Sequence, residues 1–225
     1  MSRKPNIVVL DGFPLNPGDL DWSSLEQIGN LLVYPRTSKD EMVDRAIEAD
    51  ILVVNKIKIG SKEIAQLPNL KYVAVTATGY NNLEIQALQE AEIIASNIPD
   101  YGSFGVAQHA MALLLALTNR VFPHYSDILE EKWKRSGDFS YTNSPIIELA
   151  DKTIGLVGLG KIGYRMGVMA EAMGMYVSYY SRESRNISWE YHDSIESLLQ
   201  VSDVVSLHLP LTDKTAGMIN KDSIK

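Results

Sequence analysis

Three glycines are spaced as in a binding site for the phosphates of a dinucleotide. Gly158, Gly160 and Gly163 follow an apolar run at residues 153–157 and open a helical pattern at Lys161. In this context the first glycine permits a tight turn, the second lets the backbone approach a pyrophosphate, and the third lets helix and strand pack closely. The helix N-terminus supplies N–H groups to the anion. The pattern therefore predicts dinucleotide binding, with an ordinary structural turn as the alternative.

The residues that follow the next strand, at 176–180, bear on which dinucleotide is bound. A unit that binds NAD carries an Asp or Glu there, which accepts hydrogen bonds from the ribose 2′-hydroxyl. This chain has Ser181 and then Arg182, whose guanidinium could hold a 2′-phosphate through two hydrogen bonds. The missing acid and the adjacent base favour NADP over NAD, with Arg185 as a weaker second candidate. The alternative is that Arg182 is a solvated surface residue.

Alternating strand-like and helix-like patterns must position these residues. The expected strands are residues 7–10, 31–34, 51–55, 72–76, 93–96, 153–157, 176–180 and 204–208. The expected helices are residues 24–28, 39–49, 62–66, 83–90, 104–120, 161–173 and 194–201, and Ser38 and Glu41 form a capping box for the second. Because strands joined through helices pair in parallel, we predict two doubly wound α/β domains that divide near residue 100. Residues 123–148 form a polar segment with little periodicity between the two patterns.

Composition excludes several classes of protein. The net charge is −7, with acidic and basic residues interspersed, so neither nucleic acid nor an anionic membrane surface is expected as a partner. There is no cysteine, which excludes disulfides, thiolate catalysis and Cys-based zinc sites, and we predict no metal site. The longest apolar segment, residues 106–117, is too short to span a bilayer, and the N-terminus does not resemble a signal peptide. We expect a cytoplasmic protein.

Four long blocks of the sequence, in this order, resemble the D-isomer-specific 2-hydroxyacid dehydrogenase family. They are "LPNLKYVAVTATGYNNLEI", "NIPDYGSFGVAQHAMALLLAL", "IIELADKTIGLVGLGKIG" and "SDVVSLHLPLTDKTAGMIN". Within the family, "LDGFPLNPGDLDW" and "WKRSGDFSYTNSPIIELADKTIG" are most similar to the glycerate dehydrogenase, or hydroxypyruvate reductase, branch. The resemblance covers essentially the whole chain.

The resemblance implies that the two domains have different roles. Residues 1–99 would form the N-terminal part of a flavodoxin-like substrate domain, and residues 100–225 a Rossmann domain that binds the cofactor. The second alternation reaches only three strands before Lys225, whereas a doubly wound dinucleotide domain has about six. We therefore expect the Rossmann domain to be truncated in this sequence.

The resemblance also suggests where a substrate carboxylate binds. The "TGYNN" turn in this family presents backbone N–H groups to that carboxylate, a role that falls on Thr78, Gly79 and Tyr80. A glycine-containing turn at the carboxyl end of a strand is a usual anion site in an open α/β sheet. The alternative for Gly79 is a tight turn without a ligand. Lys56, at the end of the neighbouring strand, either pairs with the carboxylate or faces solvent.

Further cofactor contacts are implied by the resemblance. Val106 corresponds to a residue that packs on the nicotinamide ring. The alternative is a place in the core of its long helix, and the two roles are compatible. Lys161 and Ile162 lie where backbone amides meet the pyrophosphate. Leu209 and Pro210 correspond to the loop beside the adenosine ribose and the nicotinamide end.

The residues that the family uses for catalysis are absent from this sequence. Relatives protonate the substrate with a His paired to a Glu, and they bind and polarise it with an Arg; all three are expected beyond Lys225. Of the four histidines, His109 is expected in the helix core, while His124 and His192 lie in polar connections. His208 ends a strand at a position that is not the family's acid. We therefore assign no catalytic residue in this chain.

The function implied is an NAD(P)-dependent oxidoreductase that interconverts hydroxypyruvate or glyoxylate with D-glycerate or glycolate. One alternative is a non-catalytic dinucleotide-sensing protein of the corepressor type, and another is a dehydrogenase for a different 2-oxoacid. The helix at residues 104–120 is apolar around much of its circumference, so it is either internal core or an interface. Relatives dimerise through the cofactor domain, which favours a homodimer.

Overall fold

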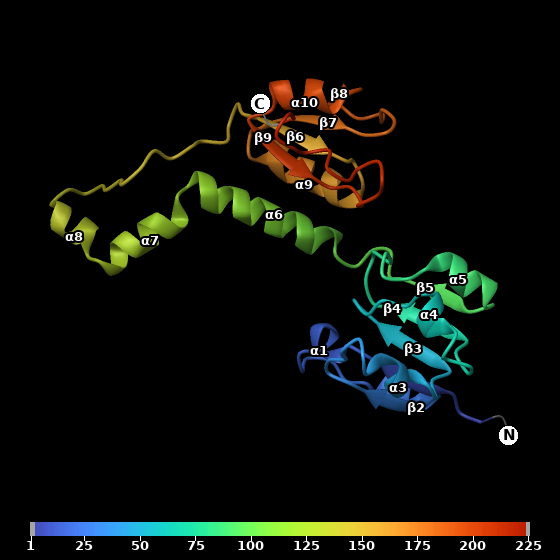
Figure 1. Ribbon diagram of the computed structural model, residues 1–225. Coiled ribbons are helices and arrows are strands. Elements are labelled where there is room, and N and C mark those ends of the chain that lie inside the picture. The colour runs from blue at the N-terminus through green and yellow to red at the C-terminus, as the bar shows by residue number, and fades with distance from the viewer. Residues whose placement is uncertain (1–2, 224–225) are drawn as a thin grey trace. The chain divides into compact units, whose positions relative to one another are not determined.

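The computed structural model describes residues 3–223. They fall into two compact units that divide between Tyr101 and Gly102 (Figure 1). Each unit is built on a parallel β-sheet of its own with helices on both faces. The predicted α/β class with two doubly wound sheets is confirmed.

The sheet of the first unit has five strands in the order β2-β1-β3-β4-β5. All neighbours pair in parallel, and this is the flavodoxin-like order. The five predicted strands are confirmed, with ends that differ from the expectation by at most one residue. Their bounds are β1 Asn6–Val9, β2 Asn30–Val33, β3 Ile51–Val54, β4 Tyr72–Val75 and β5 Ile94–Ser96.

Helices bury both faces of this sheet because side chains alternate along each strand. On β1, Val8 joins the larger core cluster, while Ile7 and Val9 join a smaller cluster on the opposite face. The larger cluster is covered by α3 (Met42–Ala46), α4 (Ser61–Ile64) and α5 (Ile85–Glu90). The smaller one is covered by α1 (Gly12–Leu15) and α2 (Ser23–Ile28).

The helix expected at residues 39–49 is shorter than predicted. Ser38 and Glu41 do interact, since the Ser38 hydroxyl and backbone N–H donate to the Glu41 carboxylate at 2.7 and 3.0 Å. However, the hydroxyl donates to this carboxylate instead of accepting a helical N–H, so it caps nothing. Residues 39–41 form a turn, and α3 begins at Met42.

The second unit has a four-stranded parallel sheet in the order β8-β7-β6-β9, which matches the first four strands of a Rossmann sheet. Its elements are β6 Thr153–Val157, α9 Lys161–Ala172, β7 Tyr176–Tyr180, β8 Glu190–His192, α10 Ile195–Val201 and β9 Val204–Leu207. Three strands were predicted and are confirmed. The fourth, β8, was missed because it is a three-residue edge strand with a polar sequence.

Three further helices precede β6. They are α6 Ser103–Thr118, α7 Val121–Leu129 and α8 Lys132–Ser136. Ala107 and Met111 of α6 pack in the same core as Met166 of α9. The expectation of irregular structure from residue 123 was wrong for α7 and α8, because Pro123 lies in the first turn of α7, where a helix tolerates proline.

Candidate functional site

Packing within the protein requires glycine at two positions of the loop after β6, whether or not a ligand is bound. Gly158 has a φ of +98°, and a Cβ atom there would lie 2.5 Å from the His208 carbonyl oxygen. A Cβ atom on Gly163 would overlap the carbonyl oxygen of Gly158. By contrast, a Cβ atom on Gly160 would meet nothing within 4 Å. The fold therefore demands the first and third glycines, whereas the space beside Gly160 is open to a ligand.

The loop leads into the N-terminus of α9. Gly160 is the N-cap residue and provides no side-chain cap, and the helix then runs for 12 residues. Lys161 is exposed and Ile162 is half-buried in its first turn. The uncapped N-terminal amides and the helix dipole together favour an anion at this position.

The carboxyl end of β9 lies against the glycine loop. The His208 carbonyl is next to Gly158, and a Cβ atom on Gly158 would be 3.1 Å from that of Leu209. Leu209 is therefore beside the loop, and Pro210, which follows it, is exposed. Burial lowers the pKa of the His208 imidazole, so this side chain is neutral at pH 7, and its Nε2 is 2.8 Å from the Ser206 hydroxyl.

The loop after β7 carries Ser181 and Arg182. The Ser181 hydroxyl donates to the carbonyl of Glu183, and the Arg182 side chain is exposed. A residue that sequence reasoning missed, Tyr179, anchors this loop: its buried hydroxyl accepts the Arg185 N–H at 2.8 Å and lies 3.4 Å from the Arg185 carbonyl. The strand pattern alone could not show this contact, because Tyr179 reads as one more core position of β7.

Two side chains of α6 are more exposed than expected. Val106 is about half exposed, so it is available for contact with a ligand and is not a core residue of the described chain. His109 is also exposed, which makes its assignment to the helix core wrong. The apolar sequence around His109 concealed that α6 buries only one stripe, which includes Ala107 and Met111.

The turn after β4 presents unused backbone donors. Thr78, Gly79 and Tyr80 are exposed, and none of their N–H groups donates to another group of residues 3–223. The Thr78 hydroxyl donates to the Ile98 carbonyl at 2.9 Å, which holds the turn in place. Gly79 has no left-handed backbone, and its Cβ atom would meet only Asn81 Oδ1 at 3.6 Å. The turn itself therefore does not require glycine.

Lys56 follows the neighbouring strand β3. Its side chain is exposed and has no hydrogen-bond or ion-pair partner in the described part of the chain. Its backbone is held, because the Lys56 N–H donates to Asp11 Oδ2 at 2.7 Å and the Asn55 N–H to Asp11 Oδ1 at 2.8 Å. Asp11 is a second residue that sequence reasoning missed.

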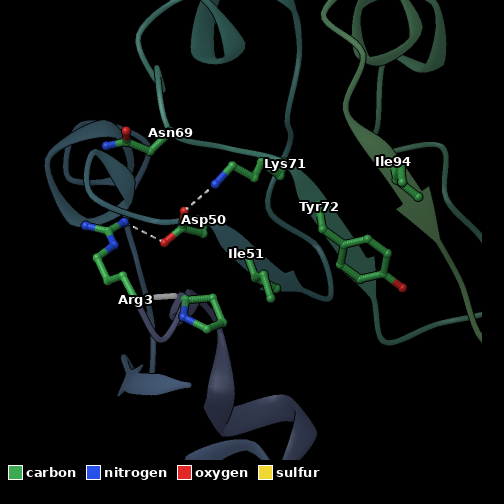
Figure 2. A pocket seen from close by; sticks show the side chains of 8 residues that line it. Arg3, Asp50, Ile51, Asn69, Lys71, Tyr72 and Ile94 are labelled. Carbon is green, nitrogen blue, oxygen red and sulfur yellow. Dashed lines mark hydrogen bonds and ion pairs between the residues drawn. The ribbon is translucent and has the colours of Figure 1, made fainter. Parts of the chain in front are cut away.

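A cavity of about 820 Å³ lies at the opposite edge of the same sheet. Ile51 and Tyr72, which line it, are the first residues of β3 and β4, so the cavity is at the amino ends of the strands. Figure 2 shows Arg3 and Lys71 directed at the Asp50 carboxylate, at 2.8 and 3.0 Å. Ligands of open α/β sheets bind at the carboxyl ends of strands, so this cavity is separate from the candidate site.

Asp50 gives a prediction about stability. Its buried carboxylate accepts the Asn6 N–H at 2.9 Å, and this hydrogen bond, followed by that from Lys71, lowers the pKa of Asp50. Asp50→Ala is expected to lower the unfolding free energy of the first unit by about 1–3 kcal/mol, because the Asn6 N–H loses its partner. Arg3→Ala and Lys71→Ala should cost less than about 1 kcal/mol each, since both cations are exposed.

The pH dependence of that effect follows from the lowered pKa. The stabilisation is complete above the pKa of an unfolded aspartate, about 3.9, and is lost as pH falls through the lower folded value. Hydrogen exchange of the β1 and β3 amides at pH 7 and at pH 3 measures it. An Asp50→Ala effect that is equally large well below pH 3 would contradict the assignment.

Among residues 3–223, no cluster of three or more His, Asp or Glu side chains is placed to hold a metal ion. In the same range, no helix combines the length and the apolar character that crossing a membrane requires.

Comparison with known proteins places the chain in a family. The family model described as "D-isomer specific 2-hydroxyacid dehydrogenase, NAD binding domain" matches residues 111–225. A hydroxypyruvate reductase of Blautia hydrogenotrophica is 40% identical over 97% of this chain and 70% of the relative. A glycerate dehydrogenase of Methylorubrum extorquens is 32% identical over 92% of this chain and 67% of the relative.

Among solved structures, an acyclic imino acid reductase in complex with NADPH and D-Arg is 29% identical, with a TM-score of 0.77. The match covers 93% of this chain and 67% of that one. The chain thus spans about two thirds of the length of the relatives it matches. Together with the glycine loop and the two parallel sheets, these matches show that the chain belongs to the D-isomer specific 2-hydroxyacid dehydrogenase family, in its hydroxypyruvate reductase and glycerate dehydrogenase branch.

Proposed function

We propose that the complete gene product reduces hydroxypyruvate or glyoxylate to D-glycerate or glycolate with a nicotinamide dinucleotide, NADPH being favoured. The observation that carries the proposal is the open space beside Gly160, between two glycines that the fold requires, at the uncapped N-terminus of α9. A dinucleotide pyrophosphate fits this arrangement of small residues and amide donors.

We further propose that residues 1–99 bind the substrate and residues 100–225 bind the cofactor. Gly158, Gly160 and Gly163, with the amides of Lys161 and Ile162, hold the pyrophosphate. Ser181 and Arg182 meet the adenosine ribose and its 2′-phosphate. Val106, Leu209 and Pro210 line the remainder of the cofactor site. When bound, the reduced nicotinamide supplies a hydride to the carbonyl carbon of the substrate.

The substrate carboxylate is proposed to bind the N–H groups of Thr78, Gly79 and Tyr80, with Lys56 as an additional cation. The exposed, unused donors of this turn support the assignment, and so does a glycine that the turn itself does not need. Substrate binding in the first unit fixes the carboxylate, which orients the carbonyl group. No residue of this chain is assigned as the proton donor.

Steady-state kinetics of the complete gene product test this proposal. We expect turnover with hydroxypyruvate and glyoxylate, and D-glycerate as the product from hydroxypyruvate. Turnover with phosphohydroxypyruvate alone would favour a dehydrogenase for another 2-oxoacid. Tight binding of the dinucleotide without turnover of any 2-oxoacid would favour the corepressor type and overturn the proposal.

We also propose that the protein is a homodimer that associates through α6, α7 and α8 and the segment after them. This part of the second unit exposes many large apolar side chains, and exposed apolar surface of this kind marks protein–protein interaction sites. They are Phe104, Leu113, Leu117, Val121, Phe122, Tyr125, Ile128, Leu129, Trp133 and Phe139. The buried Asp127 fixes the local shape, because it accepts from Lys132 at 2.7 Å, from Tyr141 at 2.9 Å and from Asn143.

Sedimentation equilibrium of the complete gene product at micromolar concentration is expected to give the mass of a dimer. Leu129→Asp should shift it to a monomer, because a buried, unpaired carboxylate is unfavourable at an apolar interface. Leu20→Asp is the matched control in the first unit, since Leu20 and Leu129 are similarly exposed, at 64% and 67%. A wild-type protein of monomer mass would exclude the dimer.

A further inference from the structure

Asp11 carries a buried carboxylate that binds the turn after the neighbouring strand β3. It lies just beyond the carboxyl end of β1, with 6% of its surface exposed. It forms no ion pair with any residue in the range 3–223. A buried carboxylate without a cation is unfavourable unless hydrogen bonds satisfy it, and each oxygen of Asp11 accepts one backbone N–H.

Both donors belong to the turn that carries Lys56. The Asn55 and Lys56 N–H groups are the first two beyond β3, and they bind different oxygens of Asp11. Two hydrogen bonds from consecutive amides to one carboxylate fix the orientation of the peptide between them. Because this peptide is fixed, the direction of the Lys56 Cα–Cβ bond is fixed as well. The Lys56 ammonium is not the partner of Asp11 and stays available to another anion.

Asn55 extends this arrangement to the next strand. Its side-chain amide lies 3.3 Å from both the carbonyl and the hydroxyl oxygens of Thr76, the residue directly after β4. Thr76 is two residues before Thr78, where the proposed carboxylate-binding turn begins. Asp11, Asn55 and Thr76 thus connect the carboxyl ends of three neighbouring strands, β1, β3 and β4.

We propose that Asp11 is a positioning residue that holds the Lys56 ammonium beside the Thr78–Tyr80 amides, so that one substrate carboxylate binds both. This inference rests on the proposed function, because it specifies how the same site binds its 2-oxoacid. Asp11 touches neither substrate nor cofactor; it acts through the backbone of Asn55 and Lys56.

A double-mutant cycle tests whether Asp11 affects substrate binding through Lys56. Asp11→Asn keeps the shape but loses one acceptor and the charge, and Lys56→Met removes the ammonium. We expect each single variant to raise the KM for hydroxypyruvate about tenfold, the equivalent of one lost hydrogen bond. The KM for NADPH should not change. The double variant should be no worse than Lys56→Met alone, because Asp11 acts only through Lys56.

Asp50→Asn is the matched control, since Asp50 is also buried and accepts a backbone N–H, but at the other edge of the same sheet. It should lower thermal stability without changing the KM for hydroxypyruvate. If Asp11→Asn behaves like Asp50→Asn, or if the effects of Asp11→Asn and Lys56→Met multiply in the double variant, the positioning role is overturned.

A measurement without turnover separates this inference from the proposed function. Oxalate is expected to slow acetylation of Lys56 by acetic anhydride, detected by mass spectrometry, and to leave the exposed Lys58 unaffected. Asp11→Asn should abolish that protection. Protection in the wild type and its loss in the variant support the inference even if the protein turns over no 2-oxoacid. Equal acetylation of Lys56 with and without oxalate in the wild type overturns it.

Discussion

Gly160→Ala is expected to weaken NADPH binding at least about a hundredfold while the fold remains intact. The new methyl group meets no protein atom within 4 Å, so it occupies only the space proposed for the pyrophosphate. A displaced pyrophosphate loses charge-assisted hydrogen bonds to the first turn of α9, which contribute about 1.5–3 kcal/mol each. Two such losses correspond to a hundredfold or more in Kd. The stability change should stay below about 1 kcal/mol, the usual difference between Gly and Ala at an N-cap.

Gly163→Ala is the contrasting variant. Its methyl group would overlap the Gly158 carbonyl oxygen, so strand and helix must separate. We expect a loss of about 1–3 kcal/mol in stability together with weaker binding. Titration calorimetry with NADPH and thermal unfolding distinguish the two variants. Unchanged NADPH affinity in Gly160→Ala would show that the ligand does not approach this backbone.

The second large effect concerns the choice between NADPH and NADH. We expect kcat/KM with NADPH to exceed that with NADH by about tenfold or more, because Arg182 can donate a charge-assisted hydrogen bond to the 2′-phosphate, which NADH lacks. The Ser181 hydroxyl already donates to the Glu183 carbonyl, so it offers the NADH ribose a neutral oxygen and no carboxylate. The double variant Ser181→Asp with Arg182→Ala should reverse the preference.

Arg185→Ala serves as the control for this experiment. The Arg185 backbone is held by the Tyr179 hydroxyl through its N–H, and that contact survives removal of the side chain. If Arg182 binds the phosphate, Arg185→Ala should change the cofactor ratio much less than Arg182→Ala does. Equal kcat/KM values for the two cofactors in the wild type, or a preference for NADH, would contradict the role given to Arg182.

Most strands of this protein could be located from local patterns. Runs such as residues 51–54 and 153–157 are buried in parallel sheets, which produces nearly continuous apolar sequences. The roles of Gly158 and Gly163 could also be inferred, because a tight turn between strand and helix leaves no room for a side chain. In contrast, β8 has a polar sequence and is held as an edge strand by its pairing with β7, so no local pattern marks it.

Contacts between distant segments could not be predicted in the same way. Asp11 and Lys56 are 45 residues apart, and they meet only because β1 and β3 are neighbours in the sheet. Tyr179 resembles any core residue of β7 until its hydroxyl is seen to hold the loop at Arg185. The predicted α3 was too long for a related reason. The Ser38 hydroxyl donates to the Glu41 carboxylate and does not accept a backbone N–H of the helix, which begins at Met42.

The sequence by itself determined the class of fold, the position of the glycine loop and the family. These depend on apolar periodicity and on steric limits at glycine, which act over a few neighbouring residues. Only the tertiary structure decided which side chains hold the loops at the strand ends. It placed the Asp11 carboxylate under the turn that carries Lys56, and it left Val106 and His109 exposed. Strand order and helix packing bring together residues that are far apart in the chain, so burial and hydrogen-bond partners follow from the whole fold.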